Sequence, residues 1–147
     1  MNIKGRILGI DYGSKRVGIA VSDPLQMLAR GLSTLVNDSG LLDRIRTIVG
    51  EEGAVRVVVG MPYAPDGGLG EKAREVDRFV RDLRRMLEVS VDTWDESFSS
   101  KDARAAFQKA GMKRKKRQEK GRVDRMAASL MLQEYLDRSI PRTADRA

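Results

Sequence analysis

Four of the five residues in the run Val55–Val59 are valine, and this run does most to limit which folds are open to the chain. A run without polar alternation is typical of a strand that is covered on both faces, as in a sheet with helices on either side. It ends at Gly60-Met61-Pro62, where a turn is expected. The run therefore predicts an α/β fold in which Val55–Val59 is a buried strand.

Apolar residues recur at helical spacing before and after this strand, which predicts an amphipathic helix on each side of it. Gly53 marks the end of the first helix, and the Pro- and Gly-rich loop Tyr63–Gly70 precedes the second. The apolar positions are Leu41, Leu42, Ile45, Ile48 and Val49 in the first helix, and Ala73, Val76, Phe79, Val80, Leu83 and Leu87 in the second.

The C-terminal third is predicted to add one strand and two helices. Ser90–Asp95 is the strand, and Ser99 or Ser100 is expected to cap a helix that runs to about Ala110. The segment Lys113–Gly121 is too charged to belong to the core. The last helix is expected at Val123–Ile140, with its inward positions at Met126, Ala127, Leu130, Met131 and Leu136.

The N-terminal part consists of short β-rich runs. Arg6–Ile10 and Arg16–Ser22 are separated by Tyr12-Gly13-Ser14-Lys15, which predicts a hairpin, and Leu32–Val36 is a third strand. Antiparallel strands followed by β-α-β crossovers imply a mixed five-stranded sheet with three leading antiparallel strands and helices on both faces. A length of 147 residues suits one domain, which we expect to span residues 1–140, followed by a short tail at 141–147.

The chain contains no histidine and no cysteine. These residues supply most general bases, most zinc ligands and all reactive thiolates, so chemistry based on them is excluded. The remaining polar groups are carboxylates, hydroxyls and cations. Carboxylate oxygens suit Mg²⁺ or Mn²⁺, which also bind phosphate oxygens, and a phosphodiester substrate fits that preference.

Three acidic residues stand where separate segments can bring them together. Asp11 follows the first strand, Glu96 follows Ser90–Asp95, and Asp124 enters the last helix. Ligands of such sheets gather at the carboxyl ends of strands, so we expect Asp11, Glu96 and Asp124 to be catalytic and to hold metal. Because strand side chains alternate, only one of Asp95 and Glu96 faces the site, and Asp95 is the fallback for Glu96.

Each of these acids also has a purely structural explanation. Asp11 can shape the turn that follows it, since aspartate accepts hydrogen bonds from nearby backbone groups. Asp124 can complement the dipole at a helix N-terminus. Neither role conflicts with metal binding.

The formal net charge of +7 is concentrated in one segment. Between Lys109 and Arg125 there are nine basic and two acidic residues, and the rest of the chain is balanced. Such a segment attracts polyanions by phosphate contacts and counterion release, although a solvated charged loop is the alternative. The expected nucleic-acid-binding residues are Lys113, Arg114, Lys115, Lys116, Arg117, Lys120, Arg122 and Arg125, together with Lys15 and Arg16 beside Asp11.

The N-terminal sequence and the absence of a long apolar run predict a cytoplasmic protein. Met-Asn-Ile-Lys-Gly-Arg is followed too soon by strand-like sequence to be a secretory signal. No apolar stretch approaches the roughly 20 residues of a membrane span.

Four motifs carry a resemblance to a known family. They are Gly9-Ile10-Asp11-Tyr12-Gly13-Ser14-Lys15-Arg16-Val17-Gly18-Ile19-Ala20, Val59-Gly60-Met61-Pro62, Asp95-Glu96-Ser97-Phe98-Ser99-Ser100 and Val123-Asp124-Arg125-Met126-Ala127-Ala128. In order and spacing they resemble the YqgF family, also described as RuvX-like Holliday-junction resolvases. The resemblance implies a ribonuclease H-like fold and a metal-dependent nuclease that matures the 5′ end of the small-subunit (16S) ribosomal RNA precursor. One position departs, because Ser97 stands where the family usually has arginine.

The mechanism that we expect has Asp11 bridging two Mg²⁺ or Mn²⁺ ions roughly 4 Å apart, with Glu96 and Asp124 completing their coordination. Three alternatives stay open: a resolvase of four-way DNA junctions, a non-catalytic nucleic-acid-binding module of the same fold, and an ATP-binding protein of the sugar-kinase and actin class. The last is suggested by Asp11-Tyr12-Gly13-Ser14 followed by Gly18-Ile19-Ala20. A pre-ribosomal particle is a possible partner, and the sequence leaves the oligomeric state open.

Overall fold

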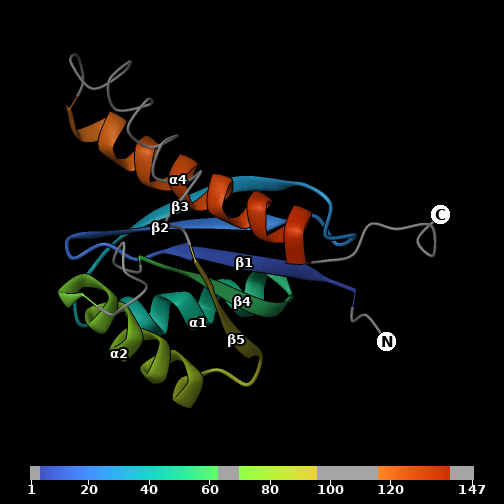
Figure 1. Cartoon of the computed structure of the whole chain (residues 1–147), viewed down its shortest axis with the longest axis horizontal. Coiled ribbons are helices and arrows are strands. Elements are labelled where there is room, and N and C mark those ends of the chain that lie inside the picture. Colours follow the sequence, from blue (N-terminus) through green and yellow to red (C-terminus); the bar gives the residue numbers. More distant parts are fainter. Residues whose placement is uncertain (1–3, 63–69, 96–115, 140–147) are drawn as a thin grey trace.

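A computed structural model describes residues 4–62, 70–95 and 116–139, and it contains one five-stranded sheet in the order β3-β2-β1-β4-β5. Helices lie on both faces of this sheet (Figure 1). The elements are β1 (Arg6–Asp11), β2 (Arg16–Ser22), β3 (Ala29–Val36), α1 (Leu41–Glu52), β4 (Ala54–Met61), α2 (Glu71–Met86), β5 (Ser90–Asp95) and α4 (Lys116–Ser139).

The mixed topology expected from the sequence is confirmed. Strand β2 pairs antiparallel with both β1 and β3, whereas β4 pairs parallel with β1 and β5. The end of α1 is also as predicted, because Gly53 adopts the left-handed conformation at φ 64° that glycine tolerates best. Strand β3 begins at Ala29, three residues before the predicted Leu32. Its first residues lack apolar alternation, and only their pairing with β2 identifies them as strand.

The valine run of β4 divides the interior into two cores. Val57 and Val59 pack with α1 and α2, and Val58 packs with α4 on the opposite face. All three side chains are fully buried. Alternating strand side chains thus supply both cores, so a nearly all-apolar β4 is required.

Helix α4 differs from its prediction at its start. It begins at Lys116, so the basic segment 116–121 is helical and Asp124 lies in the helix interior instead of at its N-terminus. The dipole explanation for Asp124 is therefore wrong. Lysine, arginine, glutamine and glutamate are good helix formers, so high charge was a poor indicator of a loop.

The inward face of α4 also differs in part from its prediction. Met126 is 38% exposed, whereas it was expected to point inward. The buried positions are Val123, Ala127, Ala128, Met131, Leu132, Tyr135 and Leu136.

Several predictions concern residues outside the described ranges. These are the loop at 63–69, the helix from Ser99 or Ser100 to Ala110, the tail at 141–147, and Glu96 itself. Within the described ranges, no helix is long and apolar enough to cross a membrane.

The connection between β2 and β3 is organised by Asp23. Its carboxylate accepts hydrogen bonds from the backbone N–H groups of Met27 at 2.7 Å, Leu28 at 2.8 Å and Leu25 at 3.3 Å. Partial burial acts to raise the pKa of Asp23, but these hydrogen bonds outweigh it and lower the pKa below 3.8. The ionised carboxylate therefore stabilises the folded state.

Replacing Asp23 by alanine should destabilise the protein by roughly 1–2 kcal/mol at neutral pH, because three backbone donors lose a charged acceptor. The pKa is lowered on folding, so this contribution is complete above the unfolded pKa of 3.8 and is lost as the pH falls through the folded pKa. Urea unfolding from pH 7 downward should show the two proteins converging at acid pH. A difference that stays constant through that range would refute the ionic origin.

Candidate functional site

Asp11 is the last residue of β1 and lies on the sheet face that α4 covers. Side chains alternate along the strand, and Ile7, two residues before Gly9 and four before Asp11, belongs to the core under α4. A Cβ at Gly9 would lie 2.9 Å from the Cβ of Leu132, so the helix passes directly over this part of β1. Asp11 is 8% exposed. The carboxylate thus sits at a strand end beneath the α4 layer.

Gly18 brings Asp124 to the same place. It is the register partner of Asp11 on β2, and a Cβ at Gly18 would lie 2.0 Å from the carbonyl oxygen of Asp124. No side chain fits between sheet and helix there. Gly31 of β3 continues the contact, because its Cβ would lie 3.0 Å from the Cβ of Arg125. Glycines of the sheet therefore set the distance between the sheet and α4.

Arg16 forms an ion pair with Asp124 that the sequence did not predict. Its Nε lies 2.8 Å from Asp124 Oδ2, and the two side chains are 36% and 22% exposed. Arg16 and Gly18 alternate onto the same face of β2, so the guanidinium reaches Asp124 from beside the glycine contact. A pair this exposed contributes at most about 1 kcal/mol to stability. Its clearer effect is to orient the Asp124 carboxylate.

Asp95 is the last residue of the edge strand β5, and its side chain does not point to the sheet face that α4 covers. Trp94 packs in the core under α4, where its ring meets Tyr135 edge-on at 5.6 Å and its Nε1 donates to Glu134 Oε1 at 3.0 Å. The next residue, Asp95, is exposed and alternates to the opposite face. Asp95 therefore does not lie on the same face as Asp11, and the choice of Glu96 over Asp95 stays a prediction because Glu96 lies outside the described residues. Among the described residues no group of three acidic side chains gathers into a metal site, and Glu96 lies beyond them.

The basic residues near Asp124 have different environments. Arg122 is exposed, whereas Arg125 is half-buried, and the Nη1 of Arg125 donates to Thr34 Oγ1 at 3.4 Å. Arg125 thus packs α4 against β3. Lys113, Arg114 and Lys115 lie outside the described ranges, and of Lys116, Arg117 and Lys120 only the helical backbone is described.

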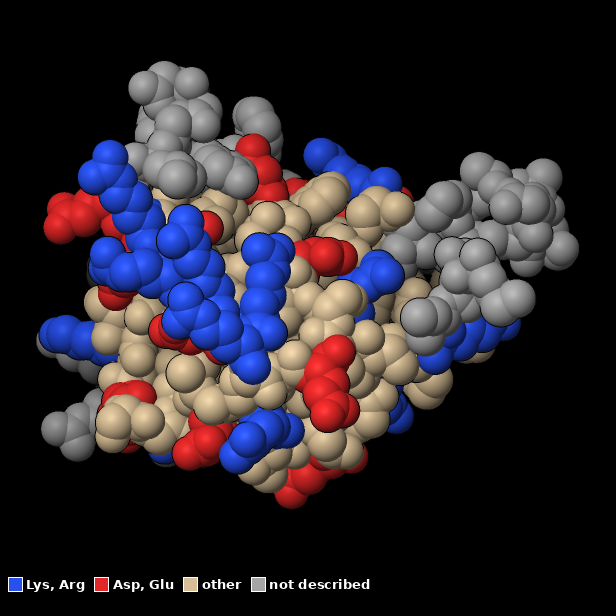
Figure 2. All heavy atoms as spheres, turned by 90° about the horizontal axis from the view of Figure 1, so that it is seen from below, with Lys and Arg blue, Asp and Glu red and all other residues tan. Residues whose placement is uncertain are grey.

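A second basic surface, on α2, was missed. Arg74, Arg78, Arg81 and Arg85 are exposed and follow one another at intervals of four, three and four residues, which places them on one helical stripe. Figure 2, seen from the side of α1 and α2, shows basic side chains gathered on this face. The spacing was visible in the sequence. It was missed because basic and acidic residues are equal in number outside the segment Lys109–Arg125. Two of the acidic residues form ion pairs with the stripe, Asp77 with Arg81 at 3.0 Å and Asp82 with Arg85 at 3.7 Å.

The donor chemistry of the Asp11 face fits a divalent cation. Asp11 and Asp124 offer carboxylate oxygens, the ligand type that Mg²⁺ and Mn²⁺ prefer. Both are partly or largely withdrawn from solvent. The face is therefore suited to hard-ion binding, with Glu96 as the remaining acid of the motif set.

Curated relatives match almost the whole chain. A protein of Chlorobaculum tepidum is 44% identical over 133 residues, which cover 90% of this chain and 93% of the relative, and its curated name is "Putative pre-16S rRNA nuclease". A Bacteroides fragilis protein with the same name is 41% identical over 133 residues, covering 90% of this chain and 96% of the relative.

The fold is also that of a solved resolvase. Thermus thermophilus RuvC in complex with a Holliday junction substrate superposes with a TM-score of 0.57 at 14% identity, over 90% of this chain and 93% of RuvC. The expected ribonuclease H-like architecture is thereby confirmed. The family model described as "RuvX: Holliday junction resolvase" matches residues 5–138. The resemblance expected from the four motifs is correct, and the chain belongs to the RuvX family, also called YqgF.

Proposed function

We propose that this protein is a metal-dependent nuclease that processes the 5′ end of a pre-16S ribosomal RNA. The observation that carries the proposal is the meeting of β1, β2 and α4 at Gly18, which sets Asp11 and Asp124 at one end of the sheet. The names of relatives more than 40% identical support the choice of substrate. A cytoplasmic location belongs to the same proposal, since the precursor RNA is made there in bacteria.

Asp11, Asp124 and Glu96 are the residues that would hold the metal. Bound divalent ions would supply an activated water for attack on phosphorus and would neutralise charge on the leaving oxygen. Asp11 is fixed by the strand, and Asp124 by the helix and by Arg16. Arg16, which contacts Asp124, would also be the cation placed to contact a substrate phosphate at this site.

The substrate assignment is tested by incubating purified protein with Mg²⁺ or Mn²⁺ and three substrates in parallel. These are a pre-16S RNA fragment, a single-stranded RNA of unrelated sequence, and a four-way DNA junction. The expected result is cleavage of the precursor at a discrete position near the mature 5′ end, and none in EDTA. Preferential cleavage of the junction would overturn the RNA assignment.

Junction resolution is the second candidate, favoured by the family description and the likeness of the fold to RuvC. Symmetric cutting of a four-way junction requires two active sites related by a two-fold axis. The alternative therefore predicts a dimer in solution and paired nicks. A protein that stays monomeric at assay concentration and cuts precursor RNA would exclude it.

The choice between Asp95 and Glu96 can be made by a pair of isosteric changes. We expect Glu96→Gln to abolish cleavage, because it removes a metal ligand, and Asp95→Asn to retain much of it, because Asp95 alternates away from Asp11. Single-turnover cleavage of the same RNA measures both. The reverse pattern would assign the ligand to Asp95.

Changing Lys113, Arg114, Lys115 and Lys116 to alanine should weaken binding to many RNA sequences alike. Each phosphate contact contributes about −0.7 to the slope of log K against log salt for single strands, so the slope should flatten by up to roughly 3. The loss should appear mainly in KM, because these residues hold the substrate and not the metal.

A control with the same change in charge separates specific contacts from net charge. It replaces four exposed cations that lie away from the basic segment, namely Lys4, Arg30, Arg46 and Arg138. If the slope of log K against log salt flattened equally in both quadruple variants, or stayed unchanged in the first, the segment 113–116 would not bind RNA specifically.

A further inference from the structure

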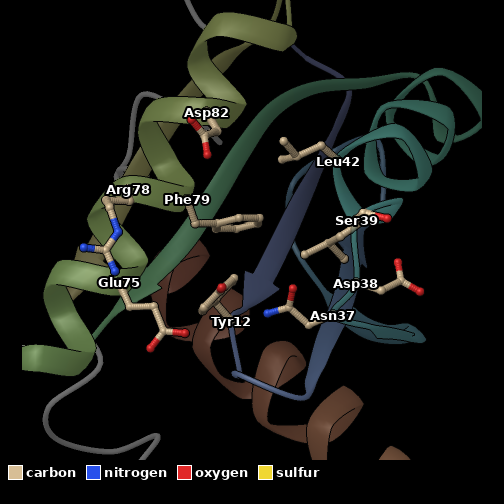
Figure 3. A pocket seen from close by; sticks show the side chains of 10 residues that line it. Tyr12, Asn37, Asp38, Ser39, Leu42, Glu75, Arg78, Phe79 and Asp82 are labelled. Carbon is tan, nitrogen blue, oxygen red and sulfur yellow. The ribbon is translucent and has the colours of Figure 1, made fainter.

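A pocket of about 450 Å³ opens on the opposite side of the sheet from α4, between α1 and α2. Its inner wall includes Tyr12, the residue after Asp11, so the pocket and the Asp11 side chain lie on opposite faces of the same end of β1. Figure 3 shows α2 on one side and the segment leading into α1 on the other. Nothing in the mechanism proposed above uses this pocket.

The floor of the pocket is aromatic and apolar. The rings of Tyr12 and Phe79 lie 4.5 Å apart between centroids, with Leu41 and Leu42 beside them. Phe79 is buried and supports the more accessible Tyr12 ring from within. Such a surface suits a planar ring, since bases stack on aromatic side chains without regard to sequence.

The rim supplies both kinds of hydrogen-bonding group from one helix. Glu75 and Arg78 lie three residues apart on α2 and both line the pocket. Figure 3 shows the Glu75 carboxylate extending from α2 toward Tyr12. A carboxylate accepts two parallel N–H bonds, and a guanidinium donates two. Asp38, also at the rim, already accepts from Arg44 and from the backbone of Gly40. Glu75 and Arg78 are therefore the groups suited to reading a ligand.

We propose that this pocket binds one guanine base of the single-stranded RNA whose backbone reaches the Asp11 face. Guanine is the base with two adjacent donors on its Watson–Crick edge, N1–H and N2–H₂, which match the Glu75 carboxylate. Its O6 and N7 acceptors match a guanidinium such as Arg78. The inference rests on the proposed RNA substrate and adds a base preference to it.

The arginine stripe of α2 supports a nucleic-acid ligand over a small metabolite. Arg78 belongs both to the pocket rim and to that stripe, and Arg74 and Arg81 extend the positive surface along the helix in both directions. Phosphates flanking a bound guanine would meet these side chains. The groups that read the edge of the base and those that contact the backbone would then come from one helix, α2.

The test is binding of fluorescent nonamers in EDTA, which prevents cleavage. The probes are oligouridine, the same oligomer with one central guanine, and the same with inosine, which lacks the 2-amino group. The wild type should bind the guanine probe about tenfold more tightly than oligouridine, with inosine between them. The ratio of the affinities for the guanine probe and for oligouridine is the guanine ratio. The Glu75→Gln variant should lose this preference, while its affinity for oligouridine stays equal or rises because a negative charge is removed.

Two matched controls on α2 keep the test specific. Glu71→Gln removes the same charge from an exposed residue that does not line the pocket, and Arg74→Gln is the counterpart of Arg78→Gln. The controls should change affinity for all probes alike and leave the guanine ratio intact, whereas Arg78→Gln should reduce that ratio.

The outcomes separate this inference from the proposed function. A wild-type protein that cleaves precursor RNA but binds all three probes equally would overturn the guanine pocket alone. A protein that prefers guanine but cleaves nothing would retain the pocket and overturn the nuclease proposal. An unchanged ratio in Glu75→Gln would also overturn the pocket, because the selecting group would lie elsewhere.

Discussion

Replacing Asp11 by asparagine should reduce the rate of RNA cleavage by about 10³-fold or more. The amide keeps the shape of the side chain but removes the charge that holds a divalent ion, and such ions contribute several kcal/mol to stabilising the transition state. Folding and RNA affinity should stay close to wild type, because the basic residues are untouched. Single-turnover kinetics with the precursor RNA, together with a binding isotherm, give both quantities.

Asp43 provides the matched control for this change. It is an exposed aspartate of α1 that pairs with Arg46 at 3.2 Å, and it lies far from the α4 face. Asp43→Asn should leave cleavage unaffected. Wild-type turnover by Asp11→Asn, or full turnover of the wild type in EDTA, would rule out a metal site at Asp11.

Replacing Gly18 by alanine should disrupt both stability and activity. The new methyl group would stand 2.0 Å from the carbonyl oxygen of Asp124, and a backbone atom cannot rotate away as a flexible side chain can. Overpacking of this kind typically costs about 1–3 kcal/mol. Helix α4 must shift, and a displacement of about 1 Å at a catalytic group can cost 10²-fold in rate.

The same substitution at Gly50 is a control in which the expected change in stability has the opposite sign. Gly50 lies inside α1, and a Cβ there would meet nothing within 4 Å. Gly50→Ala should stabilise the protein by about 0.5–1 kcal/mol, since alanine is the better helix former, and leave cleavage unchanged. Urea unfolding and turnover of the two variants can be measured side by side. A Gly18→Ala protein as stable and active as wild type would mean that the helix does not need this contact.

Local patterns predicted most of the fold. The valines of β4 and the helical spacing of α1 and α2 report side-chain burial directly, so the two covered faces of the sheet follow from them. The mixed sheet follows from the leading antiparallel strands and the β-α-β crossovers after them. The start of α4 was mispredicted because charge was treated as evidence for a loop. Six consecutive residues from Lys116 to Gly121 are helical although three of them are basic and one is acidic.

The site was only partly predictable, for a different physical reason. The motif around Asp11 and the one around Asp124 identified the acids, but their meeting depends on the register Asp11–Gly18 and on a helix that rests on a glycine 106 residues away in sequence. Arg16 was expected to hold phosphate, and its pairing with Asp124 depends on the same long-range contact. Such distances cannot be inferred from spacing along the chain.

The most direct test of a metal site at Asp11 and Asp124 is Mn²⁺ binding followed by the electron paramagnetic resonance signal of the free ion. Titrating wild-type protein into Mn²⁺ should deplete that signal in a saturable manner, and Asp43→Asn should behave identically. Asp11→Asn and Asp124→Asn should each weaken the apparent affinity at least about tenfold, because each removes an anionic oxygen ligand. Mn²⁺ binding by Asp11→Asn that equals the wild type would contradict the account.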